Sequence, residues 1–155
     1  KESKMNNSTQ AIETKHVADI IKVMNGGIDF YEKAKQEVDS PRIQRMFDKM
    51  IDAKESAVTE LQPFAIAENG EPENDSSFEV SARQAYTKVL DKVSRDSTEH
   101  TYVDQLEEVE DKVLEELDEA LKLDQPAGCE RALRAVQARM KECHDEMKAL
   151  QITTH

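Results

Sequence analysis

The sequence predicts an all-α fold, a four-helix bundle assembled from two antiparallel helical hairpins. Glycine and proline number only four each among 155 residues, fewer than the turns of a β-sheet protein need. Apolar residues recur at spacings of three and four along several long segments, which places them on one face of a helix. The two halves of the chain also repeat each other without a gap. A chain of this length can build one domain around one substantial core.

The first hairpin is predicted over residues 11–69, with the turn between its helices at Ser40-Pro41. Ser40 can accept a hydrogen bond from the exposed backbone donors of the following helix, and proline suits a first helical turn. The second helix is expected to end at Asn69-Gly70, because glycine readily adopts the left-handed conformation that closes a helix. A turn this short makes the two helices pack antiparallel.

Three further segments complete the predicted domain organisation. Residues 1–10 are polar and lack periodicity, so they are expected to lie outside a single domain over residues 11–151. They are interpreted either as a disordered tail or as a tail that was added ahead of a native start at Met5. Residues 70–98 combine a linker rich in Gly, Pro, Asn, Asp and Ser with a shorter crossover helix. Residues 99–151 are predicted to form the second hairpin.

The two hairpins align without a gap when one is shifted by 86 positions (110 minus 24). Apolar positions then coincide along both helices of each hairpin. The aligned pairs are Val17 with Val103, Ile20 with Leu106, Ile28 with Leu114, Tyr31 with Leu117, Ala34 with Ala120, Phe47 with Leu133, Met50 with Val136, Ala57 with Cys143 and Leu61 with Met147. Two related hairpins joined by a long connection are typical of ferritin-like bundles.

Charge narrows the choice of partners. Acidic residues outnumber basic ones by 33 to 21, and the formal net charge is -12. Such a surface repels phosphate backbones and anionic headgroups, so neither nucleic acid nor a membrane is expected as a partner. No apolar run approaches the roughly 20 residues that cross a bilayer, and the signal-peptide pattern is missing, which favours a cytoplasmic location. A homodimer or another protein partner is compatible with the sequence, since any apolar strip left on the crossover helix would favour association.

Three short segments carry a family resemblance. They are Ile28-Asp29-Phe30-Tyr31-Glu32-Lys33-Ala34, Glu107-Glu108-Val109-Glu110-Asp111 and Cys143-His144-Asp145-Glu146. They resemble a bacterial family of uncharacterised ferritin-like domains of unknown function, distantly similar to rubrerythrins, and the likeness spans about residues 11–151. The resemblance implies two hairpins joined by a crossover helix, and it brings no assigned reaction.

The ferritin-like arrangement suggests where a metal site would lie. Di-iron bundles use one inward Glu on the first helix of each hairpin and a Glu-x-x-His on the second. In the repeat register, the six equivalent positions hold Met24, Glu55, Val58, Glu110, Lys141 and His144. Only Glu55, Glu110 and His144 are ligands of the right type, and Lys141 puts an ammonium where a carboxylate would hold the metal. A complete di-metal centre is therefore not predicted.

Two interpretations of these positions stay open. In one, Glu55, Glu110 and His144 form a polar cluster in which the Lys141 ammonium offsets the carboxylates, or they lie in solvent at helix edges. In the other, Glu55, Glu110 and His144 bind a single zinc or iron ion, because three ligands and a water are sufficient. Other acidic residues of the helix that contains Glu110 are interpreted as a solvated face; they are Glu107, Glu108, Asp111, Glu115, Glu116, Asp118 and Glu119.

Two functions from different classes follow. The first is a non-enzymatic structural or stress-associated protein with a degenerate metal site and no cofactor. No catalytic residues are predicted, because no Ser-His-Asp or Cys-His arrangement is supported: Cys143 and His144 are neighbours that project about 100° apart on a helix. The alternative is an iron- or zinc-binding ferritin-like protein that acts in metal storage or in peroxide or oxygen chemistry.

Overall fold

Four helices make up the part of the chain that the computed structural model describes, which is residues 2–74, 89 and 99–154. They are α1 (Glu2–Glu37), α2 (Pro41–Asn69), α4 (Glu99–Leu121) and α5 (Ala127–Thr154). No strand occurs among these residues, so the all-α prediction is confirmed. The expected crossover helix within residues 70–98 lies outside the described residues, apart from Val89.

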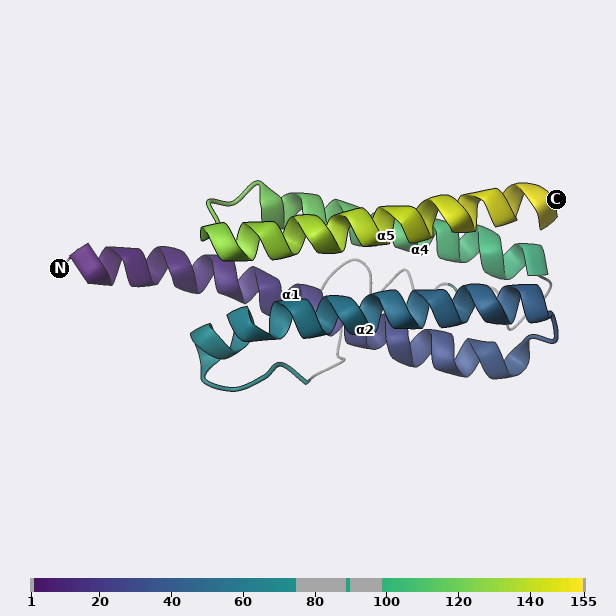
Figure 1. The fold of residues 1–155 in the computed structure, drawn as a ribbon, viewed down its shortest axis with the longest axis horizontal. Helices are drawn as coiled ribbons and strands as arrows, with labels where there is room; N and C mark the ends of the chain where they lie inside the picture. Colours follow the sequence, from purple (N-terminus) through teal and green to yellow (C-terminus); the bar gives the residue numbers. More distant parts are fainter. Residues whose placement is uncertain (1, 75–88, 90–98, 155) are drawn as a thin grey trace.

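The helices pack as two hairpins side by side. Figure 1 shows α1 running along α2, and α4 along α5, with the members of each pair antiparallel. The hairpins meet mainly where α2 lies beside α5, and α1 also contacts α4. The beginning of α1 extends past the ends of the other helices (Figure 1). The assignment of residues 1–10 as a tail outside the domain stays a prediction, as does the ferritin-like connection between the hairpins.

The boundaries of α2 form for the local reasons that the sequence indicates. The Ser40 side chain accepts a hydrogen bond from the backbone N–H of Ile43 at 3.4 Å, and Pro41 occupies the first turn. At the other end, Gly70 has a φ of 81° and donates its backbone N–H to the Ile66 carbonyl at 2.8 Å. The left-handed backbone at this position favours glycine, which explains why the helix ends there.

The buried residues of the core follow the internal repeat of the two hairpins. Of the nine aligned pairs, eight are buried in both hairpins, and the ninth, Ile28 with Leu114, is partly buried in both. The shared pattern arises because equivalent turns of the two hairpins face the same interior. Aromatic side chains join the halves at one level: Phe47 packs against Tyr31 and Tyr102 with ring centroids 5.3 Å and 6.1 Å apart.

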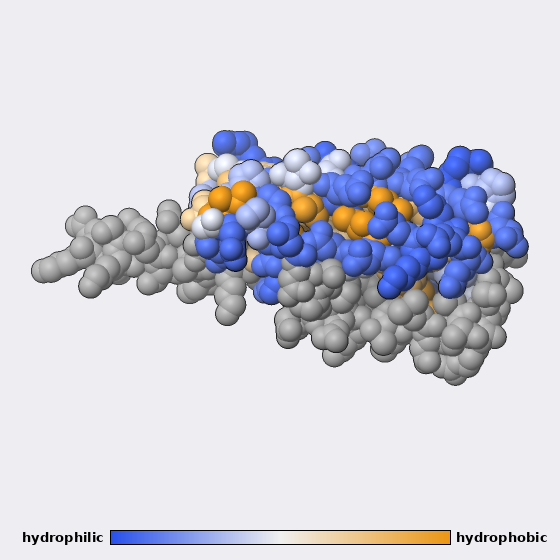
Figure 2. Space-filling view, turned by 90° about the horizontal axis from the view of Figure 1, so that it is seen from below, coloured by the Kyte–Doolittle hydropathy of each residue, from blue (hydrophilic) through white to orange (hydrophobic). Residues whose placement is uncertain are grey.

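The outside of the bundle is mostly polar. In Figure 2, hydrophilic side chains cover most of the described part of the face, and hydrophobic residues show between them. Among the described residues, Ile66 and Ile152 are the exposed large apolar side chains, at 43% and 72% exposure. No described helix is long and apolar enough to span a membrane.

Candidate metal centre

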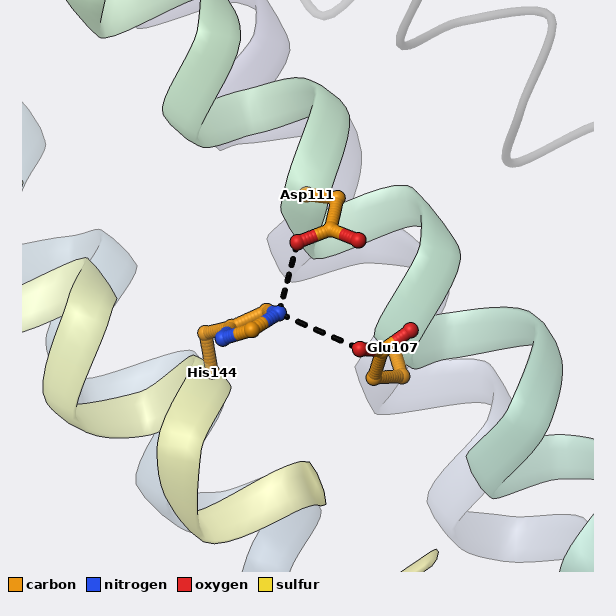
Figure 3. Close-up of side chains that lie close together, drawn as sticks. All are labelled: Glu107, Asp111 and His144. Atoms are coloured by element: carbon orange, nitrogen blue, oxygen red, sulfur yellow. Dashed lines mark ion pairs between the residues drawn. The ribbon is translucent and has the colours of Figure 1, made fainter.

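Three side chains with ligand atoms meet at the seam between α4 and α5 (Figure 3). Glu107 and Asp111 lie one turn apart on α4, so their carboxylates share a helix face, and His144 reaches them from α5. The Nε2 atom of His144 is 2.6 Å from Asp111 Oδ1 and 3.3 Å from Glu107 Oε1. In the described part of the chain, these residues form a group whose ligand atoms all lie within 4.8 Å of one another. We call Glu107, Asp111 and His144 the metal triad.

The imidazole of His144 is buried, and its inward nitrogen lacks a hydrogen bond. The residue is 8% exposed, and Nε2 itself is inaccessible to solvent. The Asp111 and Glu107 carboxylates are close to Nε2, but neither contact forms a hydrogen bond with it, and Nε2 has no hydrogen bond among the described residues. Leaving such a buried polar atom unsatisfied costs about 1–3 kcal/mol. A cation shared between Nε2 and the two carboxylates would remove that cost.

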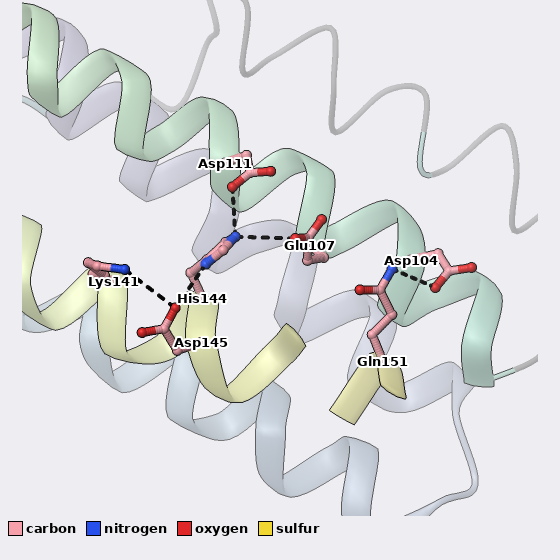
Figure 4. A network of polar contacts seen from close by, with 7 residues as sticks. All are labelled: Asp104, Glu107, Asp111, Lys141, His144, Asp145 and Gln151. Carbon is pink, nitrogen blue, oxygen red and sulfur yellow. Dashed lines mark hydrogen bonds and ion pairs between the residues drawn. The ribbon is translucent and has the colours of Figure 1, made fainter. Parts of the chain in front are cut away.

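The other ring nitrogen of His144 is oriented by a carboxylate. Nδ1 lies 3.3 Å from Asp145 Oδ1, and Lys141 Nζ lies 3.6 Å from the same oxygen (Figure 4). The hydrogen bond from His144, followed by the charge of Lys141, holds the pKa of Asp145 below its usual value. An ionised Asp145 can only accept a hydrogen bond, so it orients the neutral tautomer of His144 that carries its proton on Nδ1. In that tautomer, Nε2 presents a lone pair toward Glu107 and Asp111.

The spacing of the triad suits a small divalent ion. Oxygen and nitrogen ligands at about 2.0–2.2 Å from tetrahedral zinc stand roughly 3.3–3.5 Å from one another, which matches the 3.3 Å between His144 and Glu107. Asp111 is closer than this, but its side chain is 52% exposed and can move outward. Three protein ligands leave one position for water, which is the arrangement of open zinc sites.

The residues predicted as ligands do not come together. Glu55 lies on the exposed face of α2, whereas Glu110 is 2% exposed in the core. His144 joins the metal triad instead, and Lys141 is 67% exposed and pairs with Asp145. The metal-binding role of the set Glu55, Glu110 and His144 therefore stays a prediction without a shared geometry.

Glu110 has a different set of partners, which we call the Glu110 cluster: Glu110, Lys54 and Tyr31. Lys54 Nζ donates to Glu110 Oε1 at 2.9 Å, and the Tyr31 hydroxyl donates to Oε2 at 2.6 Å. An ammonium does offset the buried carboxylate, as one interpretation of the sequence expected, but it comes from Lys54 rather than Lys141. Both carboxylate oxygens are thereby engaged inside the bundle.

Two signals in the sequence could have revealed these contacts. Lys54 lies in phase with the buried residues Met50, Ala57 and Leu61, so its position alone places it in the core. Glu107 and Asp111 flank Glu110 on the same helix, and their contact with His144 contradicts the interpretation of the whole acidic run as solvated. The spacing of four positions between Glu107 and Asp111 is typical of two ligands on one helix face.

The fold and these contacts define the class: a helical bundle with a carboxylate–histidine group at one helix seam. Residues 13–123 match the family described as a domain of unknown function (DUF2383), and because they form most of the chain, the protein belongs to that family. No curated protein matches the chain, and no solved structure matches it. The matched residues include Glu107 and Asp111 and end before α5, which carries His144.

Proposed function

We propose that this protein is a non-enzymatic helical bundle that binds one divalent transition-metal ion through Glu107, Asp111 and His144. The observation that carries the proposal is the buried Nε2 atom of His144, which faces two carboxylates at 2.6 Å and 3.3 Å and has no hydrogen bond among the described residues. The proposal keeps the structural role predicted from the sequence. It places the ion at the α4–α5 seam rather than in the core.

The donor set favours zinc, iron(II) or manganese(II). Imidazole nitrogen suits zinc and iron, and carboxylates suit manganese as well, whereas magnesium and calcium prefer oxygen ligands alone. The two carboxylates and the neutral imidazole leave no net charge around a divalent ion. The many acidic residues of α4 add a general attraction for cations.

The Glu110 cluster argues against a second metal in the core. Lys54 is 0% exposed and its ammonium lies 2.9 Å from the Glu110 carboxylate. A metal ion bound to Glu110 would have to displace this ammonium or stand beside it, and two buried cations at contact distance repel strongly. This arrangement supports a single ion at the metal triad over a di-metal oxidase or ferroxidase centre.

A cation-free alternative has its own support in the same contacts. A protonated His144 would form ion pairs with Glu107 and Asp111 without any metal. The two possibilities differ in their response to acid. Protonation of His144 strengthens ion pairs with carboxylates, but it removes the lone pair that a metal needs.

The test is metal content and affinity. Protein purified without chelators is analysed for bound metal, and zinc, manganese(II) and iron(II) are titrated by calorimetry, iron under anaerobic conditions. We expect one ion per chain, and loss of stoichiometric binding in the double variant Glu107→Gln, His144→Ala. Glu55→Gln is the matched control, because it removes a predicted ligand that lies outside the metal triad. Absence of stoichiometric metal, or equal binding by the double variant, would overturn the proposal.

A further inference from the structure

A groove runs along the outside of the bundle between α2 and α5. Its wider end is a hollow of about 600 Å³ between the start of α2 and the end of α5, lined by Arg42, Arg45, Met46, Lys49, Glu146 and Leu150 among others. A second hollow of about 340 Å³ shares Lys49 and Glu146 with the first and continues to Ser56 and Arg139. We call the two together the α2–α5 groove.

The length of the groove indicates an elongated occupant. From position 42 to position 56 on α2, fourteen residues at about 1.5 Å each span roughly 21 Å, the length of about four helical turns. The groove is open to solvent along its side, whereas sites for small molecules bury about 70–90% of the ligand surface. Two straight, antiparallel helices form the walls, and a third helix packs naturally between such ridges (Figure 1).

The floor of the groove is apolar at its wide end, whereas most residues that line the continuation are polar or charged. Met46 and Leu150 contribute carbon surface at the wide end, and Ala53 and Cys143 do so in the continuation. The aliphatic parts of the long charged side chains extend this surface. An occupant therefore needs its own apolar face.

The rim is basic on one side, in a chain that carries a formal net charge of -12. Arg42, Arg45 and Lys49 follow one another along α2 at intervals of three and four, over about 10.5 Å of helix axis. A helix lying along α2 matches them if it carries Asp or Glu at positions i, i+3 or i+4, and i+7. Glu146 is the acidic residue of the wide end, and Lys49 contacts it at 3.3 Å. Asp52 and Glu142 line the continuation, so the basic edge is confined to the wide end of the groove.

We propose that the α2–α5 groove binds an amphipathic helix of a protein partner, with its apolar face on the groove floor and an acidic edge against Arg42, Arg45 and Lys49. A second copy of this chain fits less well. Its described exposed acidic residues on α4, such as Glu108 and Glu115, have no exposed large apolar neighbour to fill the floor. Two chains with equal net charge of this size also repel each other.

The probe is a synthetic amphipathic peptide of about 18 residues, labelled for fluorescence anisotropy, with Leu on one face and Glu at i, i+3 and i+7 along one edge. The control peptide replaces each Glu by Lys. We expect the acidic peptide to bind and the basic peptide to bind at least about tenfold more weakly, with a salt dependence typical of rim charges.

The variants locate the binding. Arg45→Glu with Lys49→Glu changes two exposed rim residues, and we expect at least about tenfold weaker binding of the acidic peptide. Arg131→Glu with Arg134→Glu changes two exposed residues of α5 outside the groove and should alter affinity by less than about twofold. Circular dichroism checks that each double variant keeps its helices.

Several results would overturn the inference. They are equal binding of both peptides, no binding of the acidic peptide at about 1 mM, or unchanged binding by the rim variant. Displacement of the peptide by dodecanoate below its micelle concentration would assign the groove to small amphiphiles instead. A dimer in sedimentation experiments that dissociates in the rim variant would assign it to a second copy.

Discussion

Lys54 and Glu110 form an ion pair at 2.9 Å inside the bundle, with side chains that are 0% and 2% exposed. They come from different hairpins, and the Tyr31 hydroxyl engages the second carboxylate oxygen. Lys54 also lies 6.0 Å from the centre of the Tyr31 ring. A pair of this kind is tolerated when its geometry and hydrogen bonds are complete, and removal of one partner leaves an uncompensated buried charge.

Replacing one member of this pair should therefore lower the stability more than replacing both members. We expect Lys54→Met to lower the free energy of unfolding by about 3–5 kcal/mol, because Glu110 stays buried without its partner. Adding Glu110→Leu should recover part of the loss, since it removes the unpaired buried charge but also removes the carboxylate that accepts from the Tyr31 hydroxyl. Urea unfolding measures both. Lys49→Met, which breaks the exposed contact with Glu146, is the control and should cost no more than about 1 kcal/mol. Equal losses in the single and double core variants would contradict this reasoning.

Asp145 should act on metal affinity through His144. On the basis of the proposed function, Asp145→Asn removes the carboxylate that orients Nδ1 of His144, and we expect the affinity for zinc to fall by about 10–100-fold. The hydrogen bond from His144 holds the pKa of Asp145 below its usual value, so Asp145 is ionised at the near-neutral pH at which His144 can bind a metal. Calorimetric titration at several pH values provides the measurement. Glu142→Gln, on an exposed position of the same helix, should leave the affinity unchanged.

Cys143 should be an unreactive thiol near neutral pH. Burial raises the pKa of its thiol to about 11, and the nearby ammonium of Lys54 only partly opposes this. Since the folded chain holds this proton more tightly than the unfolded chain, the linked stability is lost as the pH rises from about 9 toward 11. We expect alkylation of Cys143 by iodoacetamide at pH 8 to be at least about 100-fold slower in folded than in urea-unfolded protein. Mass spectrometry of the modified peptide follows the rate, and similar rates in both states would refute the prediction.

Two glycines should respond in opposite ways to alanine. At Gly70, φ is 81° and an added Cβ would meet nothing within 4 Å, so the cost of Gly70→Ala is conformational, about 1 kcal/mol. At Gly128, in the first turn of α5, an added Cβ would make ordinary contact with Phe64 at 3.7 Å. Gly128→Ala should therefore raise the free energy of unfolding by about 0.4–1 kcal/mol. Thermal or urea unfolding of both variants tests the pair, and stabilisation at Gly70 would be inconsistent with its left-handed backbone.

The helices could be predicted from the sequence because their causes are local. The apolar spacing of α1, α2, α4 and α5, the cap at Ser40 and the left-handed position at Gly70 each depend on residues a few positions apart. The end of α2 agrees with the prediction, and α4 ends at Leu121, close to where its apolar stripe does. The α1 helix, by contrast, begins at Glu2, ahead of any periodic pattern.

The site required information that no local pattern carries. The repeat register indicated that Glu110 and His144 belong near the middle of the bundle, and both are buried. It could not indicate that they face different directions, with Glu110 toward Lys54 and His144 toward Glu107 and Asp111. A rotation of a few tens of degrees about a helix axis moves a side chain from the core to a seam, and apolar spacing does not define phase that finely.

The sequence by itself determined that this chain is helical, where its first hairpin turns, which residues fill the core and that its surface is acidic. Tertiary structure decided which polar residues meet. Periodicity and caps arise from neighbours within about one helical turn, whereas Lys54 and Glu110 are 56 positions apart. His144 meets Glu107 and Asp111 only because α5 packs against α4 in one rotation about its own axis. The packing of the whole core selects that rotation.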